Sequence, residues 1–170
     1  YLNVEHKTLK TIPRLTLDEA KRMLLPKGKK YAQDEDLDAE GERLICEMIK
    51  EQYGCEFVFV THFPWKVKPF YQMKDEENHR VTKSFDLLFN GVEICSGSQR
   101  EHRFDIWKKQ AKEKGLNPES MKEYGALFQF GMPPHGGAGF GLDRITQRLL
   151  FLDNVREAVL LPRDPERMRP

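Results

Sequence analysis

Two segments of the chain combine residue types whose spacing could support chemistry. In residues 136–144 (Gly-Gly-Ala-Gly-Phe-Gly-Leu-Asp-Arg), alternating glycines leave one face of a predicted strand without side chains. A flat ligand can therefore lie against the bare backbone. Arg144 stands in the first turn of the following helix, where its guanidinium can reach a phosphate or stack on an aromatic base. The alternative is a glycine-rich bend beneath close-packed helices. A Rossmann dinucleotide loop is not predicted, because no alternating strand–helix pattern surrounds the segment.

The second segment, residues 91–100, is the predicted return strand of a hairpin. Period-two alternation puts Glu93 on the face opposite its two apolar neighbours. The small residues from Ser96 to Ser98 let a ligand come close, and Arg100 ends the run. One carboxylate, one hydroxyl and one arginine could hold a hydrated Mg²⁺ and clamp an anionic group. A solvated edge strand that ends in a charge is the alternative explanation.

The remaining reactive residue types have no spacing that indicates a site. His135 stands alone after two prolines and is expected to make a structural hydrogen bond. Ser96 has no histidine and aspartate near it in sequence, so a nucleophilic triad is not predicted. The three cysteines form no CxxC pair, which argues against zinc and disulfides and favours a reducing cytoplasm. Several lysines and arginines, Lys66 and Lys68 among them, could form a polyanion-binding surface, but solvated side chains are expected instead.

The elements that must position these residues form an α+β pattern. Thr16 and Glu19 make a capping box, and Asn90-Gly91 between two apolar runs is typical of a two-residue hairpin. Apolar periodicity predicts the other elements. The predicted helices are 16–25, 37–53, 103–114, 118–128 and 142–151, and the predicted strands are 57–61, 84–89, 92–96, 136–141 and 158–161. The chain is therefore expected to be one α+β body built around an antiparallel sheet.

Length and composition exclude several classes of protein. The 170 residues are enough for one domain, and 39% hydrophobic with 32% charged residues argues against disorder. No apolar run approaches the roughly 18 residues of a membrane-spanning helix. The net charge of +1 gives no global basic field for nucleic acid. The chain begins at Tyr1 without a signal-peptide pattern, and we expect it to start inside a longer protein.

The order of the motifs resembles the C-terminal half of the catalytic domain of class II aspartyl-tRNA synthetases of the archaeal/eukaryotic-like type. The resemblance covers roughly residues 30–170, through segments 36–43, 68–71, 93–100, 124–144, 153–156 and 162–170. It implies the class II synthetase fold, an antiparallel sheet flanked by helices, here truncated. Residues 1–170 would be the C-terminal portion of one catalytic domain. The first two class II motifs and the anticodon-binding domain would lie before Tyr1, and the chain alone is expected to be inactive.

The resemblance also implies a reaction and roles for individual residues. L-aspartate is activated with ATP, and the aspartyl group then passes to the 3′-hydroxyl of tRNA. Arg144 and Arg100 match catalytic positions, Ser96 and Arg100 match aspartate-binding positions, and Glu93 and Ser96 match Mg²⁺ positions. The ATP-binding positions are Glu93, Gly141, Leu142, Asp143 and Arg144. The parent enzyme would be a cytoplasmic homodimer with no membrane association, with ATP, L-aspartate and tRNA as partners.

Two alternatives remain open at this stage. Ser98 is similar to the residue of asparaginyl enzymes, whereas Pro133-Pro134-His135 and the segment 162–165 favour the aspartyl type. An asparaginyl-tRNA synthetase, or a synthetase-like asparagine synthetase, is therefore the first alternative. The second is a synthetase-derived binding module without chemistry. The joint presence of Glu93, Arg100 and Arg144 argues against that module, since a non-catalytic descendant has no need for all three.

Overall fold

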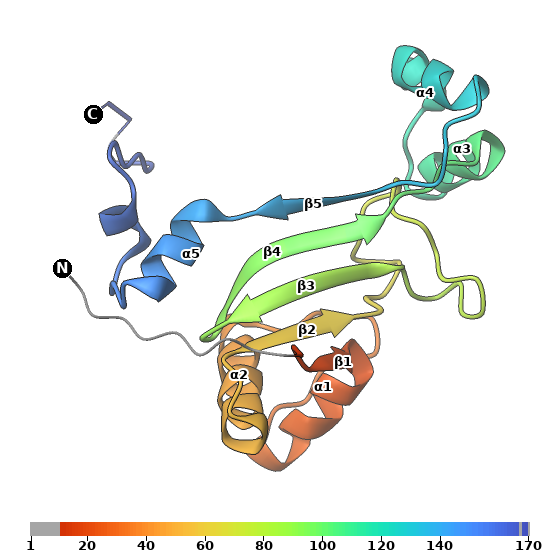
Figure 1. Ribbon diagram of the computed structural model, residues 1–170. Helices are drawn as coiled ribbons and strands as arrows, with labels where there is room; N and C mark the ends of the chain where they lie inside the picture. The colour runs from red at the N-terminus through yellow and green to blue at the C-terminus, as the bar shows by residue number, and fades with distance from the viewer. Residues whose placement is uncertain (1–10, 167, 170) are drawn as a thin grey trace.

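A five-stranded sheet forms the centre of the computed structural model, which describes residues 11–166, 168 and 169. The strands lie in the order β1-β2-β3-β4-β5, and Figure 1 shows the long β3, β4 and β5 side by side. β1 runs parallel to β2, and every other neighbouring pair is antiparallel. The strand bounds are β1 (Arg14–Thr16), β2 (Phe57–Thr61), β3 (Ser84–Phe89), β4 (Val92–Gln99) and β5 (Gly136–Phe140). The α+β expectation is confirmed.

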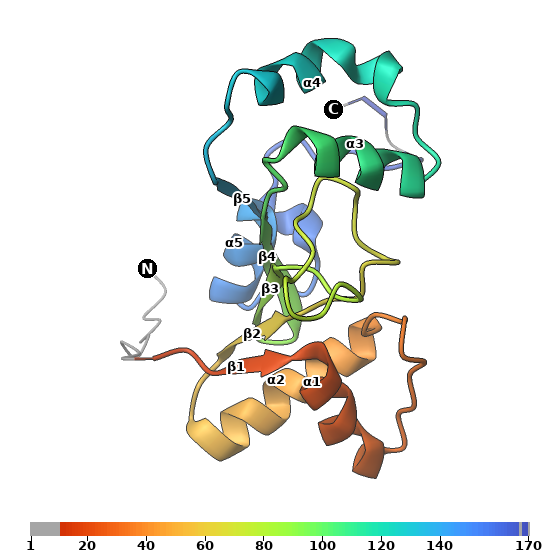
Figure 2. The same cartoon turned by 90° about the vertical axis from the view of Figure 1, so that its right-hand side faces the viewer.

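The helices gather in three places around this sheet. α1 and α2 lie by β1 and β2, α3 and α4 lie beyond the end of β4, and α5 follows β5 at the opposite end (Figures 1 and 2). The bounds are α1 (Leu17–Leu24), α2 (Ala39–Tyr53), α3 (Phe104–Glu113), α4 (Lys122–Gln129) and α5 (Leu142–Leu149), with 3₁₀ turns η1 (Leu25–Lys27), η2 (Pro118–Met121) and η3 (Val155–Ala158). Within the described residues, no helix combines the length and apolarity that a bilayer span requires.

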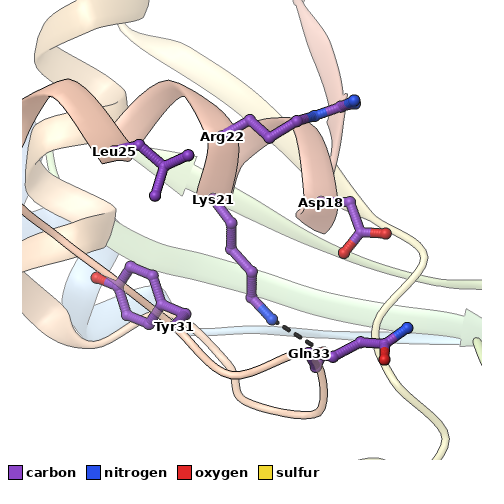
Figure 3. A pocket seen from close by; sticks show the side chains of 6 residues that line it. All are labelled: Asp18, Lys21, Arg22, Leu25, Tyr31 and Gln33. Carbon is purple, nitrogen blue, oxygen red and sulfur yellow. Dashed lines mark hydrogen bonds between the residues drawn. The ribbon is translucent and has the colours of Figure 1, made fainter.

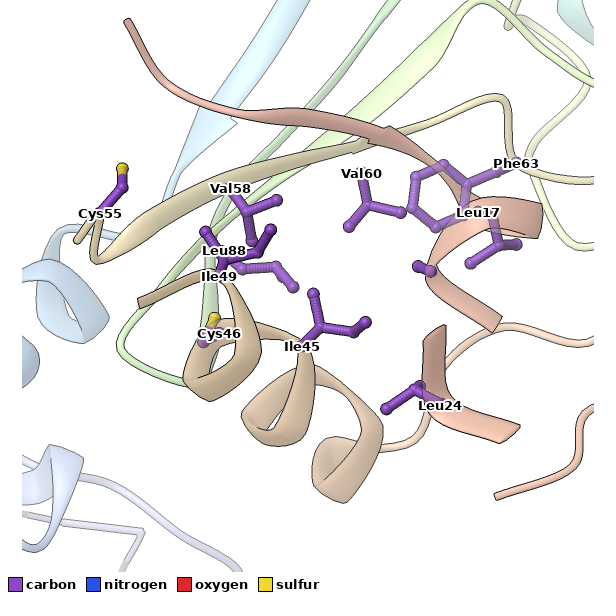
Figure 4. Close-up of a cluster of buried hydrophobic side chains, with 11 residues drawn as sticks. Leu17, Leu24, Ile45, Cys46, Ile49, Cys55, Val58, Val60, Phe63 and Leu88 are labelled. Atoms are coloured by element: carbon purple, nitrogen blue, oxygen red, sulfur yellow. The ribbon is translucent and has the colours of Figure 1, made fainter. Parts of the chain in front are cut away.

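The main hydrophobic core lies between α1, α2 and the sheet (Figure 4). Ile45 and Ile49 of α2 pack with Val58 of β2 and Leu88 of β3, all at most 2% exposed. The helical spacing of the apolar residues in α2 is what directs one face to the sheet. α1 begins at the predicted capping box, in which the Thr16 backbone N–H donates to Glu19 and the Glu19 N–H donates to the Thr16 hydroxyl.

A second, aromatic cluster holds α3 and α4 together. Trp107 is 1% exposed and contacts Phe70, Phe104, Tyr124 and Phe128, with ring centroids 5.4–6.2 Å apart. Phe128 of this cluster also lies 6.4 Å, between ring centroids, from His135 in the loop that leads into β5.

The predicted hairpin is confirmed at Asn90 and Gly91. Both have positive φ, 45° and 84°, as a type I′ turn requires. β4 is longer than predicted and runs to Gln99. It therefore carries Ser96 and Ser98 within the ladder, hydrogen-bonded to β3 on one side and β5 on the other.

The strand predicted at residues 158–161 is wrong. Val155–Ala158 is a 3₁₀ turn, closed by a capping box between Asn154 and Glu157, and the residues after it are irregular. The run Ala158–Leu161 is apolar enough for a strand, but no described strand lies beside it, and Leu160 is 93% exposed. The capping box takes Ala158 into the 3₁₀ turn, and the rest of the run lacks the neighbouring strand that a β-ladder needs.

Candidate functional site

A β-bulge in the β3–β4 ladder arranges the predicted site residues. Leu87 pairs with Cys95 and Leu88 pairs with Glu93, so Ile94 is an extra residue on β4. Glu93 and Ser96 are three positions apart, and in a regular strand they would face opposite sides. The extra residue moves Glu93 to the face of Leu88, which is also the face of Asp86 and Ser96.

Polar side chains and bare glycines share this face of β3, β4 and β5. Ser96 lies between Asp86 and Gly139, and Ser98 lies between Ser84 and Gly137. The Ser96 hydroxyl donates to Asp86 Oδ1 at 2.5 Å. Because Gly137 and Gly139 carry no side chain, the face is open on its β5 side.

Lys68 reaches this polar face from the loop between β2 and β3. Its ammonium lies 3.0 Å from Asp86 Oδ2, and the two side chains are 12% and 8% exposed. The ammonium also lies 3.7 Å from the centroid of the Phe63 ring. The expectation that Lys68 is solvated is therefore wrong, because Asp86 draws it into the sheet face.

Arg144 closes the end of the face nearest α5. Its Nη1 donates to the Glu93 carbonyl oxygen at 2.9 Å and lies 4.0 Å from Glu93 Oε1. An open pocket of about 230 Å³ lies here, lined by Glu93, Ile94, Gly139, Gly141, Asp143, Arg144 and Val155. Four of the five predicted ATP-binding residues thus line one pocket. The fifth, Leu142, is 71% exposed and is not part of the lining.

Carboxylates from three elements converge beside Glu93. Burial raises the pKa of Glu93, and the charge of Asp86 adds to this, while Arg144 acts in the opposite direction. Burial also raises the pKa of Glu42, on α2, to about 7, with Glu93 as the next cause. Burial likewise raises the pKa of Asp36. Burial, reinforced by the mutual repulsion of these carboxylates, therefore makes their charged forms costly unless a positive charge lies beside them.

Arg100 lies at the opposite end of the face from Arg144. Its guanidinium carbon lies 4.4 Å from the centroid of the Tyr71 ring, and a Cβ added to Gly137 would lie 3.3 Å from its Nη2. Its backbone N–H donates to the carbonyl of His135. Arg100 directly follows β4 and stands seven positions after Glu93, a distance of roughly 23 Å in extended chain. The site is therefore elongated, with Ser96 between its two ends.

The other sequence expectations have clear outcomes. His135 Nδ1 donates a hydrogen bond to the Pro133 carbonyl oxygen, 2.9 Å away, which confirms the expected structural hydrogen bond. All three cysteines are free thiols. In the described part of the chain, no group of three His, Cys, Asp or Glu residues could enclose a metal ion.

Sequence reasoning missed Asp86, Lys68 and Glu42. For Asp86 a signal was available, since it is a lone carboxylate within the apolar strand Ser84–Phe89. Lys68 and Glu42 stand in the segments 68–71 and 36–43 that carry the family resemblance, but no local pattern of charge or polarity directs either side chain to the site. Their places depend on contacts between segments distant in sequence.

A separate pocket lies between α1 and the loop that follows η1 (Figure 3). Its lining includes Lys21, Tyr31 and Gln33. The Lys21 ammonium already donates to the carbonyl oxygens of Ala32 and Gln33, at 2.9 and 3.1 Å. The pocket therefore presents no unpartnered lysine, and none of the sequence motifs reaches it.

Comparison with known proteins identifies the family. Residues 2–165 match the family of class II tRNA synthetases (D, K and N), so the chain belongs to that family. It is 49% identical over 161 residues to the aspartate–tRNA(Asp) ligase of Pyrococcus abyssi, covering 95% of this chain and 37% of the relative. The aspartyl-tRNA synthetase of Entamoeba histolytica superposes with a TM-score of 0.91 at 38% identity, over 95% of this chain and 33% of that one.

Asparaginyl enzymes are also structurally similar. The asparaginyl-tRNA synthetase of Pyrococcus horikoshii has a TM-score of 0.87 at 34% identity, covering 95% of this chain and 38% of that one. The resemblance and the class II fold inferred from the motif order are both confirmed. The chain spans about a third of the length of the relatives it matches.

Proposed function

We propose that residues 1–170 are the C-terminal portion of the catalytic domain of a cytoplasmic, homodimeric aspartate–tRNA ligase. The observation that carries this proposal is the bulge at Ile94, which aligns Glu93 and Ser96 on the face of Gly137 and Gly139. That alignment makes one continuous strip for a nucleotide and an amino acid. The names of the similar proteins support the aspartate reading. The first two class II motifs and the anticodon-binding domain lie outside the chain, which is inactive alone.

ATP binds at the α5 end of the strip in this proposal. The adenine lies against bare β5 backbone near Gly139 and Gly141, and the Arg144 guanidinium covers it or meets a phosphate. Arg144 is anchored to the Glu93 carbonyl, so its position is set before the nucleotide arrives. The positioned Arg144 guanidinium would stabilise the negative charge that develops on the phosphates during adenylate formation.

Mg²⁺ fits the oxygen donors of this region. Glu93 and Ser96 present carboxylate and hydroxyl oxygens on one face, and these are ligands that Mg²⁺ prefers, while Asp86 beside them is engaged by Ser96 and Lys68. An incomplete protein cage suits an ion that keeps several waters and binds substrate phosphates. Glu93 and Ser96 would hold the ion, which would supply charge neutralisation for the phosphates when bound.

L-aspartate binds at the Arg100 end. The planar guanidinium can take the side-chain carboxylate with two parallel hydrogen bonds, and Ser96 lies on the same face towards the nucleotide. The aspartate α-carboxylate then attacks the α-phosphorus of ATP, and pyrophosphate leaves. In the second step the 3′-hydroxyl of tRNA takes the aspartyl group and AMP leaves. Both steps depend chiefly on positioning.

An asparaginyl enzyme is the second candidate. The buried Ser98 hydroxyl has no hydrogen-bond partner in the described structure, and a hydroxyl can accept from an amide as well as donate to a carboxylate. The similarity to the Pyrococcus horikoshii enzyme points the same way. Among the superposed structures, the higher identity to the aspartyl enzyme of Entamoeba histolytica, 38% against 34%, supports aspartate as the preferred substrate.

ATP–pyrophosphate exchange tests the proposal. It is measured with Mg²⁺ on the longer protein in which this chain completes the catalytic domain, with L-aspartate or L-asparagine supplied in turn. Exchange with aspartate alone is the expected result, and Glu93→Gln should reduce it at least 100-fold while Glu47→Gln, an exposed change on α2, leaves it unaltered. Exchange with asparagine alone transfers the assignment to the second candidate. Exchange with neither supports a binding module without chemistry.

A further inference from the structure

We propose that Tyr71 is the positioning residue of Arg100, holding its guanidinium between the Tyr71 ring and Gly137 so that its donors face an incoming carboxylate. This inference deepens the proposed function and rests on it for the identity of the carboxylate, which belongs to the amino-acid substrate. Neither Tyr71 nor Gly137 was among the site residues expected from the sequence.

The Arg100 guanidinium is held from two sides. The Tyr71 ring centroid lies 4.4 Å from its central carbon, a stacking distance for a cation on an aromatic ring. On another side, a Cβ at Gly137 would approach Nη2 to 3.3 Å and Nε to 3.4 Å. Those distances are tighter than ordinary contact, so only a glycine leaves the guanidinium undisturbed.

The donors of Arg100 are left unused by this arrangement. Within the described residues, its side chain makes the ring contact with Tyr71 and no hydrogen bond or ion pair. Ser98, next to Gly137 in the ladder, is 3% exposed and its hydroxyl also lacks a partner. A half-buried cation beside an unsatisfied buried hydroxyl is a combination that a bound carboxylate would complete.

Tyr71 is itself fixed in place. Its carbonyl oxygen accepts from the Glu101 N–H at 2.9 Å, and the next residue, Gln72, forms a β-bridge with Arg100. Its ring meets Phe70 edge-on at 5.6 Å, and Phe70 meets the buried Trp107 at the same distance. The aromatic cluster of α3 and α4 is thereby connected to the guanidinium. A side chain supported in this way is pre-organised for its ligand.

Two substitutions on Tyr71 separate the ring from the hydroxyl. Tyr71→Phe keeps the ring, and Tyr71→Leu removes it. In aspartate-dependent ATP–pyrophosphate exchange, Tyr71→Leu should raise the KM for aspartate about tenfold, the size expected of a partly desolvated cation–π contact, with a smaller change in kcat. Tyr71→Phe should stay within about twofold of the unsubstituted enzyme. Tyr53→Leu, an exposed tyrosine at the end of α2, is the matched control.

A second variant and a second measurement protect the test against misfolding and against failure of the proposed function. Gly137→Ala disturbs Arg100 from the other side without touching the aromatic cluster, and should raise the same KM. By NMR, the Arg100 side-chain protons should be shifted upfield by the Tyr71 ring, in Tyr71→Phe as well, and this shift should vanish in Tyr71→Leu. A wild-type shift with no aspartate-dependent exchange would overturn the proposed function alone. An unchanged KM in Tyr71→Leu, or a shift that persists there, overturns the role of Tyr71.

Discussion

The ammonium of Lys68 lies 3.0 Å from the Asp86 carboxylate, and both side chains are almost completely buried. Asp86 also accepts the hydrogen bond of Ser96, so the pair supports the hydroxyl at the centre of the proposed site. A buried ion pair adds little stability compared with apolar residues, but loss of one partner leaves an uncompensated charge. The pair therefore makes the position of Ser96 sensitive to a residue in a distant loop.

Lys68→Met should destabilise the fold by about 3 kcal/mol, because Asp86 would remain buried without its cation. Denaturant unfolding measures the change. The exposed pair of Lys66 and Asp34, 3.6 Å apart, is the control, and Lys66→Met should cost less than about 1 kcal/mol. Adding Asp86→Asn to Lys68→Met should recover part of the loss. Equal costs for the two lysine variants would contradict the importance of burial.

Glu42 predicts a pH dependence of stability. Burial raises its folded-state pKa from 4.5 to about 7, so the folded state binds the proton more tightly than the unfolded state. Stability should accordingly fall as the pH rises from about 4.5 to 7 and then level off. Glu93, whose pKa is also raised, contributes in the same direction.

The variant Glu42→Gln isolates this effect. It should stabilise the protein at pH 8, where the wild-type carboxylate is charged, and change little at pH 4. Urea unfolding over this pH range provides the measurement. Glu47→Gln, an exposed change on the same helix, should leave the pH profile as it is. If the free energy of unfolding of the wild-type protein does not fall between pH 4.5 and 7, the pKa of Glu42 is not raised by burial.

Local patterns were enough to predict most of the elements. The capping box at Thr16, the Asn90-Gly91 turn and the apolar spacing of α2 are signals contained within a few residues, and each structure formed where expected. The run at 158–161 shows the limit of such reasoning, because a strand also needs a neighbour. The described structure offers none, and the capping box at Asn154 forms a 3₁₀ turn instead.

The candidate site was predictable in its residue types but not in its geometry. Regular alternation along β4 would place Glu93 and Ser96 on opposite faces of the sheet. The bulge that brings them to the same face depends on how Leu87 and Leu88 of β3 pair with β4. The same holds for Tyr71, whose contact with Arg100 joins positions 29 residues apart. The order of the motifs was enough to identify the family, although it does not show which residues of different motifs are in contact.

Ser98 offers a test of the amino-acid end of the site. Its buried hydroxyl has no partner among the described residues, so Ser98→Ala should leave stability unchanged or raise it by up to about 1 kcal/mol. The same change should raise the KM for aspartate several-fold, since the hydroxyl lies on the face shared by Ser96 and Arg100. Thermal unfolding and exchange kinetics give the two readouts. A lower stability with an unaltered KM would assign Ser98 a structural role only.

A substitution at Gly139 should affect ligand binding without affecting the stability of the fold. A Cβ at this position meets nothing within 4 Å, and its φ lies outside the left-handed range, so Gly139→Ala should fold normally. The new methyl group would project onto the bare face next to Ser96, where the nucleotide is proposed to bind. We therefore expect ATP affinity, measured by calorimetry on the longer enzyme, to fall at least tenfold while the melting temperature stays within about 2 °C.

Gly97 provides the opposite case on the neighbouring strand. A Cβ there would lie 2.6 Å from the Phe85 ring and 2.9 Å from Ala138, on the other face of the sheet. Gly97→Ala should consequently destabilise the fold by about 1–3 kcal/mol, as overpacked sites do. Its ATP affinity, measured below the unfolding transition, should change less than that of Gly139→Ala. Normal ATP affinity in Gly139→Ala would place the nucleotide away from β5 and require a different site.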